Sequence, residues 1–187
     1  MWIKKITLCL CAGLLMLNGI AQKKYTFRSQ NFIGIIRGQE ENALLVQTIN
    51  GIQRKSVFAG LGVGLDNYRI QSVPVFLNVS TFLFGDQNFF VTGSGGINFS
   101  TQKDRLGILL SSGVQYPARA YWEGGIGFRV PTGDRGGAIL FNAGYSYKSI
   151  REKRKTSSPC PTGNCPEGHE MYDFRMSRFL FKVGYMF

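Results

Sequence analysis

The sequence predicts an all-β protein, an eight-stranded antiparallel transmembrane β-barrel, on three observations. Segments whose side chains alternate between two types recur along the chain. Past residue 22, no uninterrupted apolar stretch reaches the roughly 18 residues of a membrane helix, so a membrane-embedded chain must close as a barrel. One face of the segments is apolar, and the other carries glycine, polar and charged residues. A soluble ligand-binding barrel has an apolar inside and a polar outside, whereas a membrane barrel has the apolar face outside. The alternative is a β-sandwich with one solvent-exposed face.

The first 21 residues have the pattern of a secretory signal peptide. Two lysines precede a 12-residue apolar run at residues 6–17 (ITLCLCAGLLML), which is shorter than the roughly 20 residues of a membrane helix. Small residues stand at the minus-three and minus-one positions of a cut after Ala21. We expect residues 1–21 to be removed and residues 22–187 to form one outer-membrane β-barrel domain.

Eight strands are predicted in the mature chain. They cover residues 32–38, 44–52, 56–66, 72–84, 89–100, 121–130, 138–150 and 174–187. In the first two strands, apolar and polar residues do not alternate cleanly between the two faces. An even number of strands, each about 9 to 11 residues long, is typical of transmembrane barrels.

The third strand shows the alternation most clearly. Gly60, Gly62 and Gly64 share one face, and five apolar residues share the other. Each glycine would destabilise a helix by about 1 kcal/mol relative to alanine. Inward glycines in a small barrel instead leave room for large neighbours, so a strand is favoured.

The last two strands repeat the pattern. In residues 137–150, Phe141 and Tyr145 share a face opposite Asn142 and Lys148. At the C-terminus, aromatic and apolar residues alternate with small and polar ones and end on Phe187. We expect lipid-facing aromatic residues to lie near the membrane interfaces. They are Tyr121, Trp122, Tyr145, Tyr147 and Tyr185.

The junctions alternate in length. Residues 53–55, 86–88 and 132–136 are short, whereas residues 101–120 and 151–173 are long. Transmembrane barrels have short periplasmic turns and longer outside loops. We therefore expect both termini on the periplasmic side and two long surface loops at residues 101–120 and 151–173.

Charged residues fall on the predicted inward face. They are Asp66, Glu123, Arg129, Lys148, Arg178 and Lys182. An eight-stranded barrel has an interior just wide enough for side chains. We interpret these residues as buried charges that hold the barrel shape, with a narrow ion path as the alternative.

The C-terminal residues Lys182, Gly184, Tyr185 and Phe187 resemble the C-terminal signal of outer-membrane β-barrel proteins. With this ending, the mature chain resembles the small outer-membrane barrels of Gram-negative bacteria, the OmpA-like and OmpX-like families. Residues 60–66 (GLGVGLD) and 73–77 (VPVFL) are similar to stretches in uncharacterised porin-like and PorT-like barrels. The resemblance implies a bacterial outer-membrane location and delivery by the barrel assembly machinery.

The second long loop carries two candidate sites. Cys160 and Cys165 are candidates for a disulfide, because an exported protein meets an oxidising compartment. A metal site that adds His169 is the alternative, although four residues rather than two separate the cysteines. A basic run at the root of the loop is a candidate site for the outer leaflet's phosphate-bearing glycolipid, with a solvated edge as the alternative. Its bases are Arg151, Lys153, Arg154 and Lys155.

Composition limits the function classes. With one histidine in 187 residues, His169, little material exists for histidine-dependent catalysis, and no cofactor motif is present. Export makes nucleic acid an improbable partner for the net charge of +11. We therefore predict a non-enzymatic structural or interaction protein that engages an envelope protein, a surface ligand or glycolipid through its loops. The alternatives are a small passive pore, a subunit of a larger secretion or uptake complex, and a lipid-modifying enzyme that uses His169.

Overall fold

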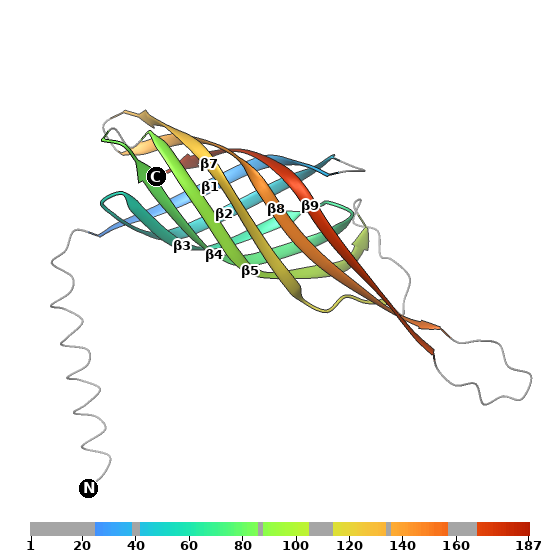
Figure 1. The fold of residues 1–187 in the computed structure, drawn as a ribbon. Coiled ribbons are helices and arrows are strands. Elements are labelled where there is room, and N and C mark those ends of the chain that lie inside the picture. The colour runs from blue at the N-terminus through green and yellow to red at the C-terminus, as the bar shows by residue number, and fades with distance from the viewer. Residues whose placement is uncertain (1–24, 39–41, 86–87, 105–113, 134–135, 157–167) are drawn as a thin grey trace, which may run out of the picture.

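The computed structural model describes residues 25–38, 42–85, 88–104, 114–133, 136–156 and 168–187, and the ordered elements in them are strands (Figure 1). The strands are β1 (Thr26–Arg37), β2 (Asn42–Arg54), β3 (Val57–Asp66), β4 (Ile70–Leu83), β5 (Phe89–Asp104), β6 (Val114–Gln115), β7 (Arg119–Thr132), β8 (Gly137–Thr156) and β9 (Gly168–Met186). Among the residues described, no helix is long and apolar enough to cross a membrane.

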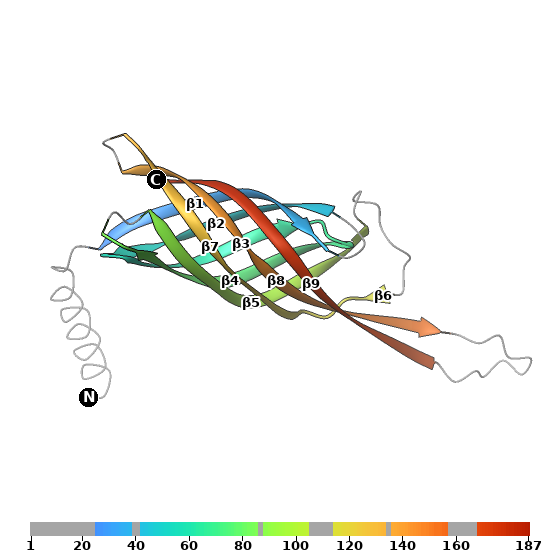
Figure 2. The same ribbon diagram turned by 45° about the horizontal axis from the view of Figure 1, so that its top comes forward.

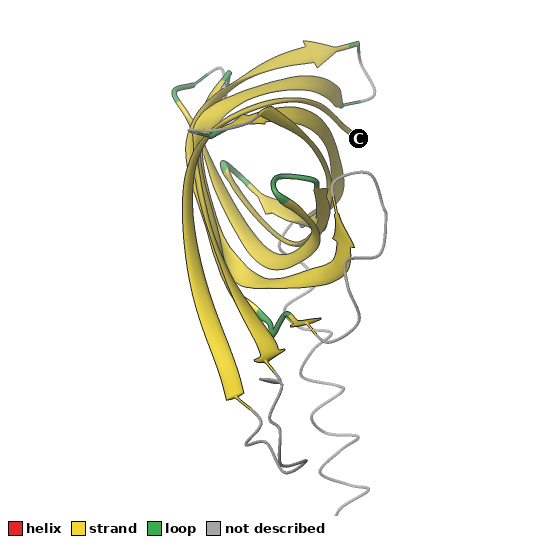
Figure 3. Cartoon of the chain, turned by 90° about the vertical axis from the view of Figure 1, so that its right-hand side faces the viewer, coloured by secondary structure: helices red, strands yellow, loops and turns green. Residues whose placement is uncertain are grey.

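Eight of these strands close into an antiparallel barrel. The hydrogen-bonded order is β8-β7-β5-β4-β3-β2-β1-β9, and β9 pairs back with β8. The two-residue strand β6 lies outside the ring and pairs only with the far end of β8. The predicted fold class, an eight-stranded antiparallel barrel, is confirmed, and the end-on view shows the strands curving around a common axis (Figure 3).

The register fixes the dimensions of the barrel. Following paired residues from Met186 once around the ring returns to β9 at Met176, ten residues away. A stagger of this size tilts the strands by about 40° from the barrel axis. Eight strands at this tilt enclose a space that side chains fill.

The outer face is apolar and exposed. Leu61, Leu77, Ile126 and Phe181 have 63%, 64%, 67% and 69% of their surface exposed, values that favour lipid rather than water as the surroundings. Aromatic residues stand at the two ends of this apolar belt. Trp122 packs on Tyr145 and Tyr147 towards the loop end, and Phe89 packs on Phe128 towards the turn end.

Inward glycines receive phenylalanine rings from neighbouring strands. A Cβ added to Gly62 would strike the ring of Phe76, and one added to Gly184 would strike the ring of Phe32. Each glycine lies directly opposite its phenylalanine in the strand register. The glycine face predicted for residues 57–65 therefore lies on the inside and makes room for aromatic side chains.

The predicted loop at residues 151–173 is wrong over about half its length. Strands β8 and β9 stay in continuous register from Ala138↔Met186 to Thr156↔Gly168, so residues 151–156 and 168–173 are paired strand. Figure 2 shows this end of the β8–β9 hairpin projecting away from the barrel. We call residues 151–156 and 168–173 the projecting hairpin. The other predicted loop, at residues 101–120, also contains strand, because β5 runs to Asp104 and β6 lies within the range.

Candidate functional site

Three charged residues from three strands meet inside the loop end of the barrel. Arg178 Nη1 donates to Asp66 Oδ2 at 2.7 Å, and Lys148 Nζ lies 3.2 Å from the same oxygen. Lys148 Nζ also donates to Ser72 Oγ at 2.9 Å and to the backbone oxygen of Tyr68 at 3.1 Å. The side chains of all three charged residues are fully buried, so each charge depends on these partners rather than on water.

A second buried cluster surrounds Glu123 in the middle of the barrel. Glu123 Oε1 accepts hydrogen bonds from Lys182 Nζ at 2.7 Å and Ser94 Oγ at 3.2 Å. Glu123 Oε2 accepts from the Tyr121 hydroxyl at 2.6 Å and from Gln47 Nε2 at 3.1 Å. The carboxylate therefore has four donors, as a buried charge requires.

Tyr121 corrects one prediction. The residue is 2% exposed and points inward with Glu123, two positions along the same strand. Trp122, Tyr145 and Tyr185 lie on the exposed outer face as predicted. Because side chains alternate along a strand, the inward assignment of Glu123 already required an inward Tyr121, and this signal in the sequence was missed.

Polar and aromatic side chains fill the barrel towards the turn end. Asn78 Nδ2 donates to Thr92 Oγ1 at 2.8 Å and to Ser94 Oγ at 2.9 Å. An apolar layer also fills the interior, a buried cluster that contains Phe32, Phe58, Phe76, Phe82, Phe90, Leu140 and Met186. The side chains of the two charged clusters and of this apolar layer together fill the barrel interior.

Arg129 differs from the other predicted interior charges. It is half-buried, and its guanidinium lies 5.4 Å from the centre of the Phe82 ring. The acids that the structure describes inside the barrel, Asp66 and Glu123, pair with Lys148, Arg178 and Lys182 instead.

The projecting hairpin is cross-linked by exposed ion pairs. Arg151 binds Asp173 in a bidentate manner, with Nε to Oδ1 at 2.5 Å and Nη2 to Oδ2 at 2.6 Å. Hydrogen bonding from Arg151 holds the pKa of the Asp173 carboxyl below its ordinary value. Arg154 Nη2 contacts Glu152 Oε1 at 3.0 Å. The bases of the predicted glycolipid site therefore lie on strand β8 rather than in a loop, and two of them are paired with acids.

One edge of the projecting hairpin has no strand beside it in the described structure. Strand β9 pairs with β1 only over Phe179–Met186, whereas residues 168–178 pair with β8 alone. Ser29 and Phe187 exchange both backbone hydrogen bonds, at 2.9 and 3.0 Å, so the backbone groups of odd-numbered β9 residues point away from β8. Among the described residues, none pairs with the outward N–H and C=O groups of Met171, Asp173, Arg175 and Ser177. We call residues 168–178 of β9 the free edge.

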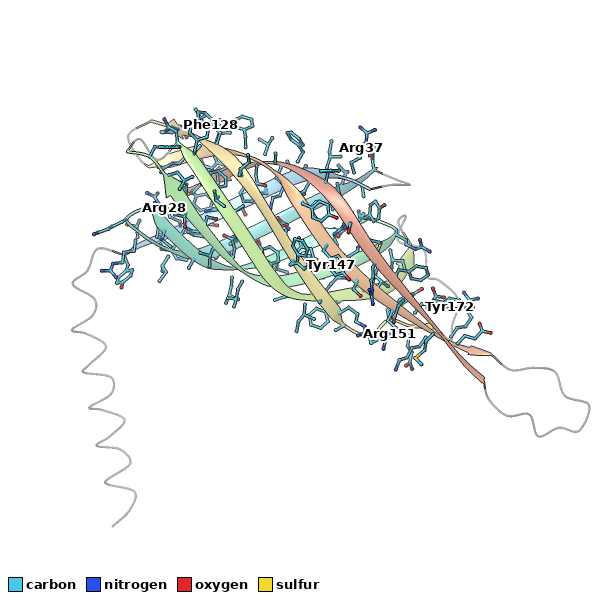
Figure 4. The ribbon with its side chains drawn as sticks, viewed as in Figure 1. Arg28, Arg37, Phe128, Tyr147, Arg151 and Tyr172 are labelled. Carbon is cyan, nitrogen blue, oxygen red and sulfur yellow. The ribbon has the colours of Figure 1, made fainter. Side chains whose placement is uncertain are left out.

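The free edge also exposes large side chains beyond the membrane belt. Met171 is 63% exposed and Tyr172 is 46% exposed. Met171 lies six residues past Ser177, the partner of the interfacial Tyr147, which corresponds to about 20 Å along the strand. Figure 4 shows Tyr147, Arg151 and Tyr172 in this order along the hairpin.

The remaining predicted site residues have side chains outside the described part of the structure. Cys160 and Cys165 lie outside the described residues. His169 lies opposite Lys155 in the β8–β9 register, and neither side chain is described. Among described residues, no group of three or more His, Cys, Asp or Glu side chains could hold a metal ion.

Comparison with known proteins supports the fold. Over 89% of this chain and 90% of the other, the structure is similar to the solid-state NMR structure of the outer membrane protein AlkL in DMPC lipid bilayers, with 12% identity and a TM-score of 0.50. The chain has the fold of a small outer-membrane β-barrel. The outer membrane protein OprG from Pseudomonas aeruginosa matches over 87% of this chain and 94% of its own, with 14% identity and a TM-score of 0.39. No family model matches the chain, and no curated protein matches its sequence.

Proposed function

We propose that this chain is a non-enzymatic protein of the bacterial outer membrane, exported by residues 1–21, that binds an envelope or surface partner through the projecting hairpin. The observation that carries the proposal is the free edge of β9. Unpaired backbone groups on an exposed strand are a template for strand addition, in which an extended segment of another chain becomes the next strand.

The rest of the structure supports an interaction role over conduction. Side chains from the two charged clusters and the apolar layer occupy the barrel interior, and Arg178, Lys148 and Phe58 are each at most 1% exposed. A passive pore needs a continuous polar lumen. Single-channel recording of the purified protein in a planar bilayer should therefore show no conductance steps, and regular steps would support the pore alternative.

The geometry of the hairpin suits strand addition. The bidentate Arg151–Asp173 pair ties β8 to β9 beyond the membrane, which holds the edge in extended form before a partner arrives. Main-chain hydrogen bonds would supply affinity, and the exposed Met171 and Tyr172 would supply apolar contacts. The finer resemblance to OmpA-like, OmpX-like and PorT-like barrels, and recognition of glycolipid by the basic residues of β8, stay predictions.

Proline substitution tests strand addition directly. Met171→Pro removes an N–H that points to the free edge and leaves the bonds to β8 intact, whereas Met171→Ala removes the side chain and keeps the N–H. With a photo-crosslinker placed at Ser177, we expect Met171→Ala to retain crosslinking to an envelope or surface protein and Met171→Pro to lose it.

Hydrogen exchange gives the second readout. An extended peptide from the crosslinked protein should slow exchange at the amides of Arg175 and Ser177, which point to the free edge. Amides of Phe174 and Met176, which point to β8, should not change. Equal crosslinking by the two Met171 variants, or protection that ignores this alternation, would contradict strand addition.

A further inference from the structure

Polar side chains interrupt the apolar belt on the outer face of β1 and β2. Asn31 is exposed on β1 between Phe27 and Ile33, which are 65% and 60% exposed on the same face. Thr48 lies directly opposite Asn31 on β2, and Asn50 follows two residues along the same face. Lipid tails offer no hydrogen-bond partner, so exposed amides are unfavourable in a lipid-facing wall. We call Asn31, Thr48 and Asn50 the polar patch.

The polar patch borders a groove in the outer wall. The groove has a volume of about 690 Å³ and is lined from β1, β2, β3, β8 and β9, of which β9, β1, β2 and β3 lie side by side (Figure 1). The lining includes Asn31, Val46, Thr48, Val63, Val183 and Tyr185. In the strand register Asn31 lies between Tyr185 and Thr48, so polar groups cross three neighbouring strands. A concave surface that also offers hydrogen bonds suits a packed contact with protein.

Aromatic residues are distributed unevenly around the outer face. Exposed aromatic residues point outward from β5, β7, β8 and β9, among them Phe89, Trp122, Phe141 and Phe179. Residues 42–83 are described throughout, and within them the outward side chains of β2, β3 and β4 include no aromatic residue. The aromatic residues of these strands, Phe58, Phe76 and Phe82, are buried in the interior. Aromatic residues anchor the lipid-facing wall of a membrane barrel at its interfaces, so this part of the wall lacks its lipid anchors.

We propose that the outer face of β1, β2 and β3 around the polar patch is an interface with a second copy of this chain. A two-fold axis parallel to the barrel axis keeps both copies in the same orientation in the membrane and places equivalent residues at the same depth. Groups near that axis therefore meet their own equivalents. An amide carries both a donor and an acceptor, so Asn31 and Asn50 are each complementary to their equivalents in the second copy. This face is separate from the free edge and does not depend on it.

Sedimentation equilibrium of the mature barrel, in a detergent matched to the solvent density, measures the association directly. We expect an equilibrium between monomer and dimer. Replacing both amides, Asn31→Leu with Asn50→Leu, should weaken dimerisation by about tenfold, because hydrogen bonds across the interface are lost. These changes make the outer face more apolar, so a heat-shift gel should show a folded barrel. A barrel that stays monomeric at every protein concentration would overturn the proposal.

A matched pair of valines tests the face without changing its polarity. Val63 on β3 and Val91 on β5 both point outward, with exposed fractions of 42% and 46%. Val63→Trp fills the groove and should weaken dimerisation by about tenfold, because the packed contact with the second copy is lost. Val91→Trp lies among the lipid-facing aromatic residues and should keep the dissociation constant within about twofold. Equal losses in the two variants would contradict an interface on β1, β2 and β3.

Photo-crosslinking then identifies the occupant. A crosslinker at Thr48 in the outer membrane should give a product of twice the mass of the chain, joined to a peptide from β1, β2 or β3 of the second copy. A product that contains a different protein, that contains lipid alone, or that joins Thr48 to β5 or β7 of the second copy would overturn the proposal. None of these measurements involves residues 168–178, so loss of strand addition at the free edge would leave them unchanged.

Discussion

Strands β8 and β9 pass through two regions with opposite organisation. In the barrel each has a strand on both sides, apolar side chains face outward, and charges are fully buried. In the projecting hairpin β9 has one neighbour in the described structure, and the Arg151–Asp173 pair is exposed over 32% and 46% of its side chains. The β8–β9 register is continuous through both regions. The surroundings of a side chain, rather than the strand pairing, therefore decide how much it contributes to stability.

The largest difference between the regions should be the loss of stability when an acidic residue is replaced. Asp66→Asn leaves Lys148 and Arg178 buried without a counter-charge, and we expect the free energy of unfolding to fall by about 3 to 5 kcal/mol. Asp173→Asn removes the acid of the exposed pair and should leave the unfolding midpoint of the barrel unchanged. Denaturant unfolding in detergent measures both variants, and equal effects would contradict the comparison.

Glycines on opposite faces of the barrel wall sharpen the same contrast. Gly62→Ala drives a methyl group into the Phe76 ring, and we expect it to lower the free energy of unfolding by about 2 kcal/mol. Gly93 faces outward, and nothing lies within 4 Å of a Cβ added there. Gly93→Ala should therefore be neutral, and a loss as large as that of Gly62→Ala would show that the cost is not steric.

A smaller effect is expected when a tyrosine inside the barrel is compared with one on its outer face. Tyr121→Phe removes a 2.6 Å hydrogen bond to Glu123, and we expect a loss of about 1.5 kcal/mol in the free energy of unfolding. Tyr145→Phe alters a residue on the exposed outer face and should have no measurable effect on unfolding. A neutral Tyr121→Phe would mean that the remaining donors satisfy Glu123 without the hydroxyl.

The smallest effect concerns pH at the hairpin. The pKa of Asp173 is lowered by Arg151, so the ion pair is complete above the ordinary aspartate pKa of 3.8 and is lost as pH falls through the lowered value. The NMR resonance of the Arg151 Nε–H should shift in that acidic range while the heat-shift gel of the barrel stays unchanged. In Asp173→Asn this titration should disappear, and its persistence would assign it to another acid.

The sequence predicted the strands well where each strand separates two environments. Between lipid and a packed interior, the alternation of residue types is enforced, which is why all eight barrel strands were found. The projecting hairpin has water on both faces, so residues 151–156 carry no alternation and were interpreted as a loop. The start of the first strand was also predicted late, at residue 32, whereas β1 begins at Thr26.

The partners within the interior could be predicted only in part. The inward positions of Asp66, Glu123 and Lys148 follow from alternation, but which cation meets which acid depends on the stagger around the ring. A single sequence gives no direct measure of that stagger. The structure therefore shows two pairings that could not be predicted. Asp66 contacts two cationic residues, and Arg129 lies over an aromatic ring rather than beside an acid.

The opposed glycine and phenylalanine residues restrict how the barrel can close. At the pairing of β1 with β9, Phe32 lies over Gly184, and a slip of two residues would bring Lys182 or Met186 beneath the ring instead. Both are buried side chains, so either slip creates a clash inside a filled interior. A barrel of the same strands with a smaller or larger stagger is thereby disfavoured, and the correct circumference is selected when the first and last strands meet.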